Sequence, residues 1–156
     1  MANTYYLIGS YNAIANENSA ITISGIDQTY TDLLIQINAA DRASSNYSGS
    51  YLRFNSDTSS NYYYKRGMNN QGSPFKDSAA STTSIDCGYF PGANLTNQFG
   101  GMLIYIPNYT WSNGKSVLIE TAQEGNVATT NMYTPTMVTG YWSGTSAISS
   151  FTIGCS

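Results

Sequence analysis

Two short stretches decide the fold class of this 156-residue chain: Met-Leu-Ile-Tyr-Ile at 102–106 and Leu-Leu-Ile-Gln-Ile-Asn at 33–38. Apolar side chains recur in both at every second position, which is the repeat of a β-strand with one face on a core. Similar short runs occur at 5–8, 20–25, 51–54, 62–65, 85–90, 115–121, 137–142 and 147–153. No window of about eleven residues shows a 3.6-residue repeat, so the sequence predicts an all-β chain of about ten short strands.

Turn-forming residues separate these runs. Asn113-Gly114 is a strong hairpin or turn signal, and Ser143-Gly144-Thr145 separates two further strands. Strands at regular spacing with such turns predict a single antiparallel β-sandwich domain over residues 1–156. We expect a jelly-roll-like arrangement, with an immunoglobulin-like sandwich as the alternative, because the sequence does not determine the strand order.

One segment, Met68–Ser84, lacks the alternating pattern. It is polar and made of small residues, and Phe75 is its only aromatic residue. Its length exceeds that of ordinary connections, which predicts a long polar loop over 68–84. Such a loop is either a solvated crossover of the sandwich or a contact loop for a neighbouring subunit.

The composition argues against several classes of function. Only 10% of residues are charged, with 6 Lys and Arg against 9 Asp and Glu, so we expect no binding to nucleic acid. The chain has no His, which removes Ser-His-Asp chemistry and the commonest zinc ligand. No carboxylate pair is placed for acid–base work, and the longest apolar run is too short to insert in a membrane. The sequence therefore predicts a protein that is not an enzyme, without catalytic residues, metal or cofactor.

Two cysteines, Cys87 and Cys155, form no metal-binding or disulfide-rich pattern. They are expected to be free or partly buried thiols, and a single bridge between them is the alternative. Two arginines, Arg42 and Arg53, are expected to pair with Asp41 and Asp57 and to hold loops in place.

The aromatic residues carry more information, since the chain has 14 Tyr. The stretch Tyr-Tyr-Tyr-Lys-Arg at 62–66 places rings on both faces of a strand, so at least one ring faces outward. Tyr is favoured at interfaces and also stacks on sugars, whereas the alternative is a Tyr-rich core with hydroxyls at its rim. The predicted intersubunit interface consists of Tyr62, Tyr63, Tyr64, Arg66 and Phe75.

The run SAITISGIDQTYTDLLIQINAADRAS at 19–45 resembles a family of virion proteins of tailed bacteriophages from marine and fresh water. The resemblance continues, in the family's order, through YLRFNSDTSSNYYYKR at 51–66, FGGMLIYIPNYTWSNGKSV at 99–117 and YWSGTSAISSFTI at 141–153. It implies a small β-sandwich module, found alone or at the ends of longer fibre proteins. It carries over no catalytic or ligand residues.

The resemblance implies a non-enzymatic virion structural protein, assembled in the host cytoplasm, that decorates or cements the capsid as a homo-oligomer. Its partners would be other copies of itself and capsid or tail proteins. The alternative is a receptor-binding module of a tail fibre that recognises host surface carbohydrate. Family members commonly continue with a further strand, so either this chain is trimmed at its C-terminus or a neighbour's strand completes the sheet. The start at the module itself favours a decoration protein.

Overall fold

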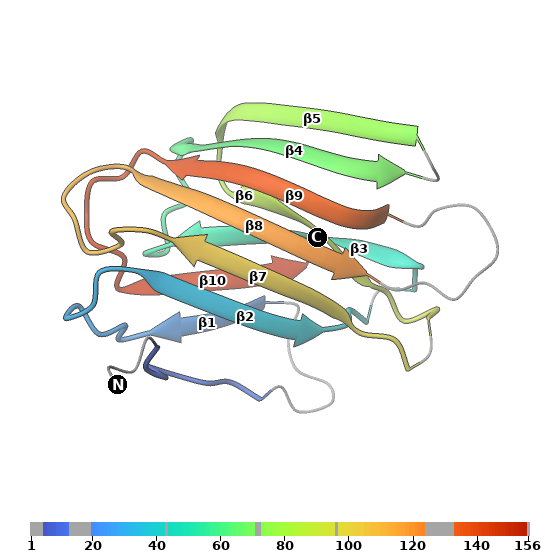
Figure 1. The fold of residues 1–156 in the computed structure, drawn as a ribbon, viewed down its shortest axis with the longest axis horizontal. Helices are drawn as coiled ribbons and strands as arrows, with labels where there is room; N and C mark the ends of the chain where they lie inside the picture. Colours follow the sequence, from blue (N-terminus) through green and yellow to red (C-terminus); the bar gives the residue numbers. More distant parts are fainter. Residues whose placement is uncertain are drawn as a thin grey trace.

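The chain folds into two facing β-sheets, as the alternating pattern predicts (Figure 1). The computed structural model describes residues 5–12, 20–42, 44–70, 73–95, 97–123 and 133–155, and these contain strands but no helix. The all-β sandwich is therefore confirmed. Its strands are β1 (Ala20–Ser24), β2 (Leu33–Ala39), β3 (Tyr47–Phe54), β4 (Tyr62–Asn70), β5 (Ser73–Thr82), β6 (Ile85–Pro91), β7 (Gly100–Ile106), β8 (Lys115–Gln123), β9 (Tyr133–Trp142) and β10 (Ser150–Cys155).

The chain passes repeatedly between the two sheets. One sheet has the order β1-β10-β3-β6 and the other the order β2-β7-β8-β9-β4-β5, and all neighbouring strands are antiparallel. Only the connections β4–β5, β7–β8 and β8–β9 stay within one sheet; the others change sheet. The six-stranded sheet lies in front in Figure 1, with the four-stranded sheet behind it. The jelly-roll arrangement stays a prediction.

The core lies between the sheets and follows the period of two. Ile104, Ile119 and Val138 stand side by side in the register of β7, β8 and β9, and all three are fully buried. Leu52 and Phe54 belong to the opposite sheet, and their fully buried side chains lie in the same core. Removing such apolar side chains from water stabilises the fold by roughly 25 cal/mol per Å². The alternation thus predicts these strands because their inward sides meet a second apolar layer.

The prediction of a long loop over 68–84 is wrong. β4 and β5 pair antiparallel from Tyr62 opposite Thr82 to Asn70 opposite Ser73, so most of that segment is a β-hairpin. β5 is the outermost strand of its sheet. Backbone hydrogen bonds to β4 hold it there, and an edge strand needs no apolar repeat because little packs on it.

Two smaller expectations are also corrected. Residues 5–8 form no strand, and the segment 5–12 runs without regular structure. The connection from Ile106 to Lys115 is a longer loop, in which Asn113-Gly114 forms only the last part. Here Gly114 is required for space, because a Cβ would lie 2.0 Å from the hydroxyl oxygen of Tyr141.

Candidate functional site

The structure separates the five residues of the predicted interface. Tyr62 is fully buried in the core, where its hydroxyl accepts a hydrogen bond from the backbone N–H of Phe54 at 2.9 Å. Desolvation raises the pKa of Tyr62 to about 12. Tyr64 is half-buried against the same core. The ring of Tyr62 is not available on the monomer surface for a partner, which corrects the prediction for Tyr62, whereas the partly exposed Tyr64 stays a prediction.

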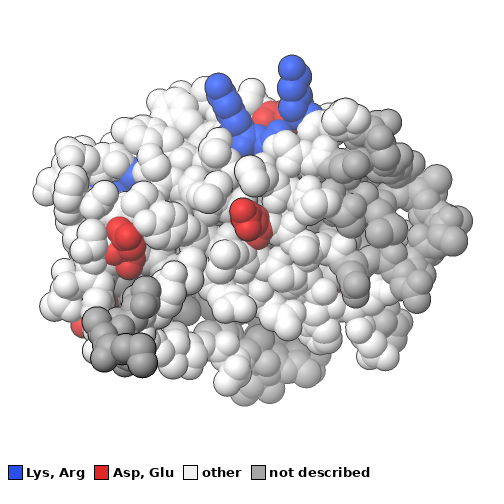
Figure 2. Space-filling model, viewed as in Figure 1, with Lys and Arg blue, Asp and Glu red and all other residues white. Residues whose placement is uncertain are grey.

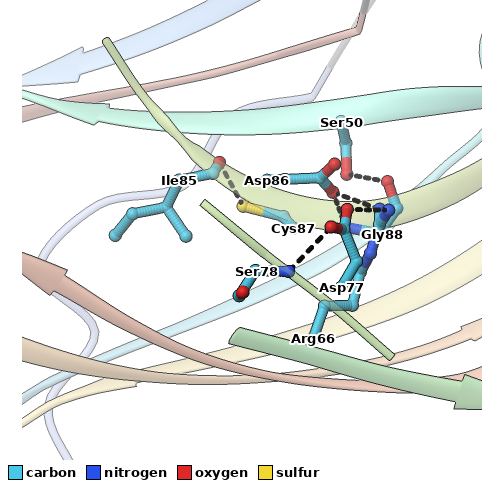
Figure 3. A network of polar contacts seen from close by, with 8 residues as sticks. All are labelled: Ser50, Arg66, Asp77, Ser78, Ile85, Asp86, Cys87 and Gly88. Atoms are coloured by element: carbon cyan, nitrogen blue, oxygen red, sulfur yellow. Dashed lines mark hydrogen bonds and ion pairs between the residues drawn. The ribbon is translucent and has the colours of Figure 1, made fainter. Parts of the chain in front are cut away.

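Arg66 is also buried, contrary to the prediction. Its guanidinium lies between two carboxylates, Asp86 Oδ1 at 2.7 Å and Asp77 Oδ2 at 3.1 Å (Figure 3). The backbone N–H of Gly88 donates a further hydrogen bond to Asp86 at 2.9 Å. The guanidinium also lies 5.3 Å from the ring centroid of Tyr89. Arg66 therefore connects β4, β5 and β6, and its role in the monomer is to join the two sheets.

In this network, burial and the neighbouring charges shift the pKa values of Asp86 and Arg66 in opposite directions. Burial raises the pKa of Asp86, while hydrogen bonds from Gly88 and Arg66 partly offset that rise. Burial alone would lower the pKa of Arg66, but the neighbouring carboxylates raise it. Arg66 thus stays charged, and Asp86 depends on Arg66 for its charge in a desolvated place. Within the described residues, ion pairs are formed by Arg66 alone. The expected Arg53–Asp57 pair is absent, since Arg53 Nε donates to the carbonyl of Thr83.

Only Tyr63 and Phe75 of the predicted interface are exposed. Tyr63 points outward from β4, and its ring centroid lies 6.1 Å from that of Tyr141 on β9. Phe75 stands opposite the buried Met68 in the register, so both belong to the core side of the hairpin. Phe75 remains 47% exposed because β5 is the edge strand. The two exposed rings therefore lie on opposite faces of the β4–β5 hairpin and do not form one site.

The feature that sequence reasoning missed is the outward side of the six-stranded sheet, called here the outer face. Its exposed large apolar residues, each 37–55% exposed, are Leu34, Tyr63, Leu103, Tyr105, Leu118, Met137 and Tyr141. They come from five adjacent strands, β2, β7, β8, β9 and β4. The signal was present, because the strands quoted at the start carry Leu and Tyr at their outward positions as well.

The strand register places these residues in contiguous rows. Leu34 stands opposite Tyr105, which stands opposite Leu118. In the next row, Leu103 stands opposite Glu120 and Glu120 opposite Met137. Neighbours of this kind have Cβ atoms about 5 Å apart, so the rows form one apolar surface.

Figure 2 shows this side of the molecule with few charges. Blue side chains stand at the edge where β4 and β5 lie, and the described outward residues with positive charge there are Lys65 and Lys76. Glu120 is the carboxylate inside the rows. At one end, the hydroxyl of Tyr105 donates to Asp32 at 2.8 Å, a bond that raises the pKa of Tyr105 and fixes its ring.

A shallow groove of about 670 Å³ crosses the outer face. It exists because small residues interrupt the rows: a Cβ added at Gly67 or Gly101 would meet nothing within 4 Å. Leu103, Glu120 and Met137 border this space. The groove offers apolar contact and one carboxylate, but no arrangement of acid and base is visible among its described residues.

Among the described residues, no acidic or Cys side chains form a group of three or more that could hold a metal ion. No helix in the described part of the chain is long and apolar enough to cross a membrane. Cys87 and Cys155 are both free thiols, as the first alternative predicts.

Comparison of the chain with protein-family models, with curated proteins and with solved structures gives no match.

Proposed function

We propose that this chain is a non-enzymatic structural protein of a bacteriophage virion, a capsid decoration or cement protein that forms homo-oligomers on the particle surface. The observation that carries the proposal is the outer face, with seven large apolar side chains 37–55% exposed in adjacent rows. Contiguous apolar patches of this kind on a soluble protein mark interaction sites. The resemblance in the sequence supplies the virion as the setting.

The rest of the described structure agrees with an assembly role. The hydrogen-bonded loops and the Arg66 network fix the sheets relative to each other, so the outer face is presented on a rigid scaffold. A preorganised surface loses little conformational entropy when it binds. Low charge reduces the desolvation cost of burying the face against another protein.

Two measurements test this proposal. Static light scattering coupled to size exclusion should show the purified 16.9 kDa chain as a defined oligomer. Gold-labelled antibodies against the chain should decorate the heads of phage particles from a lysate that contains it. Particles free of the protein would contradict a virion role, and label confined to the tail would contradict a capsid role.

The groove favours one second candidate, a tail-fibre module that recognises host surface carbohydrate. Its volume of about 670 Å³ falls in the range of small-ligand sites, and exposed tyrosines on the same face offer stacking surfaces. A glycan array should then show binding that Glu120→Gln weakens. An array at background for the assembled protein would contradict this candidate.

A further inference from the structure

We infer that the outer face docks against the outer face of a second copy, with Glu120 of each copy beside Lys65 of the other. This inference rests on the proposed function, because it names the partner and the surface for the self-association proposed there.

The size of the face is sufficient for a dimer. Five strands about 4.8 Å apart, each contributing about seven residues at roughly 3.3 Å, cover about 550 Å² on each copy. Face-to-face packing would bury about 1,100 Å² in total, which exceeds the ~1,000 Å² expected of a specific interface. The apolar residues already stand in rows at strand spacing, so two such faces can pack as the sheets of a sandwich do.

The other outward side of the sandwich is different, which makes the choice of face specific. Thr22, Thr152 and Arg53 stand side by side there in the register of β1, β10 and β3. The hydroxyls of Thr22 and Thr152 are hydrogen-bonded to each other at 2.8 Å. Arg53 covers the ring of Tyr51, with its guanidinium 4.7 Å from the ring centroid. The polar groups at these outward positions are paired or stacked, as expected of a sheet face turned to water.

The charges on the outer face are complementary under a twofold rotation. Glu120 lies on β8, and Lys65 lies on β4, with β9 between these two strands. A twofold axis running along β9 places β8 of each copy across β4 of the other and β7 across β5, so the five strands in the interface are β7, β8, β9, β4 and β5, and β2 lies outside it. Glu120 then meets Gly67, where no side chain blocks it; Lys76 stands beside Gly67 in the same row, and Lys65 is one row away. The same rotation keeps the two Glu120 carboxylates apart and satisfies both charges, as an isologous interface requires.

The proposal also explains the most exposed member of the rows. Met137 is 55% exposed at the middle of β9. A residue on a twofold axis meets its own counterpart, so Met137 would contact Met137 of the second copy. A flexible thioether suits such a self-contact, because it fills irregular gaps.

The test is sedimentation velocity of the full chain over micromolar to millimolar concentration. Wild type should form a dimer, and Leu118→Arg should raise the dissociation constant at least 100-fold. The matched control is Ser24→Arg, an exposed strand position on the polar side, which should leave it unchanged. Thermal melts of each variant must match wild type, because only a folded variant reports on the interface.

Charge reversal tests the orientation independently of apolar burial. Glu120→Lys and Lys65→Glu should each weaken the dimer about tenfold or more, and the double variant should recover most of the loss. If the double variant is as weak as the single ones, the twofold arrangement is wrong.

The remaining outcomes separate the inference from the proposed function. If Leu118→Arg self-associates as tightly as wild type, the inference is overturned while self-assembly of the chain stands. If wild type is a monomer that binds phage particles, and Leu118→Arg does not bind them, the outer face contacts the capsid shell and the inference of a dimer is overturned. A monomer that is absent from particles would contradict the proposed function itself.

Discussion

The indole Nε1–H of Trp142, at the end of β9, donates a hydrogen bond to Oδ2 of Asp57 at 2.8 Å, across 85 residues of chain. Asn61 donates to the same oxygen at 2.9 Å, and the backbone N–H of Ser59 donates to Oδ1 at 2.8 Å. Asp57 therefore fastens the loop between β3 and β4 to the rim of the core. Backbone groups of the loop add to this attachment, since the backbone N–H of Ser143 donates to the carbonyl of Asn61 at 2.9 Å.

The free energy of unfolding should depend on pH through the ionisation of Asp57. Burial raises the pKa of Asp57, but the hydrogen bonds from Asn61, Trp142 and Ser59 outweigh burial and lower it to about 2. The folded pKa lies below the unfolded value of about 3.9, so Asp57 stabilises the fold above about pH 4 and loses this effect as the pH falls towards 2. We expect Asp57→Asn to cost about 1–2 kcal/mol at pH 7 and little at pH 2. Urea unfolding at both values measures the difference.

Asp27→Asn is the matched control. Its pKa is also lowered, by hydrogen bonds from Thr29, but Asp27 is exposed and stays within its own loop. The control should lose far less stability than Asp57→Asn at pH 7, because Asp27 is exposed and an amide oxygen still accepts the bond from Thr29. An Asp57→Asn variant with the acid sensitivity of wild type would show that another group carries it.

Adjacent tyrosines on β4 should respond differently to loss of a hydroxyl. Tyr62→Phe leaves the backbone N–H of Phe54 without its acceptor in the core, at a cost of about 1–3 kcal/mol. Tyr63→Phe changes an exposed ring and should stay within about 0.5 kcal/mol of wild type. The measurement is the free energy of unfolding at pH 7 at a concentration where the chain is monomeric. Equal losses at the two positions would contradict this assignment of faces.

The sequence predicts the strands with a buried side far better than the edge strand. β8 has Val117 and Ile119 at alternate inward positions, and that repeat is visible in the sequence. β5 has small or polar residues at most positions and Phe75 as its one large apolar residue, so its pairing with β4 depends on backbone hydrogen bonds that no side-chain repeat reports. The only clue was its length, which was equally compatible with a loop.

At the candidate site, too, the sequence predicts some features and leaves others to the fold. The sequence establishes that the tyrosines at 62–64 alternate between faces, but which set faces inward depends on where the second sheet packs. The burial of Arg66 depends on two carboxylates 11 and 20 residues away that become neighbours only in the folded chain. The sequence does not reveal the outer face, because Leu103 and Leu118 are far apart along the chain and only the strand register joins them.

Both thiols should be unreactive in the folded chain. Burial raises the pKa of Cys155 to about 11 and that of Cys87 well above its usual value. At pH 8 only about one Cys155 in a thousand is then a thiolate, so its reaction with DTNB should be at least about 100-fold slower than that of a free thiol. Cys155→Ser leaves Cys87 as the only thiol, which should react only after unfolding. A rapid burst of one thiol per native chain would contradict this placement.

Because of the Arg66 network, the variant Arg66→Met should lose stability relative to wild type as the pH rises. Arg66→Met removes the cation that offsets the desolvation of Asp86, and breaking such a buried pair costs about 3–5 kcal/mol. Without Arg66, the folded pKa of Asp86 rises further above its unfolded value of about 3.9. A carboxyl group with a raised pKa stabilises the fold below that unfolded value and loses the effect as the pH rises. The deficit of Arg66→Met in urea unfolding should therefore grow from pH 3.5 to pH 7.

Two further variants locate the effect. Arg66→Met combined with Asp86→Asn should recover most of the loss at pH 7, because the amide oxygen still accepts from Gly88 and no charge is buried. Asp77→Asn should cost less than about 1 kcal/mol, since the side chain of Asp77 is 39% exposed and water can replace the ion pair. If the double variant is as unstable as Arg66→Met alone, the loss comes from packing of the Arg66 side chain, and Asp86 is not the group that needs it.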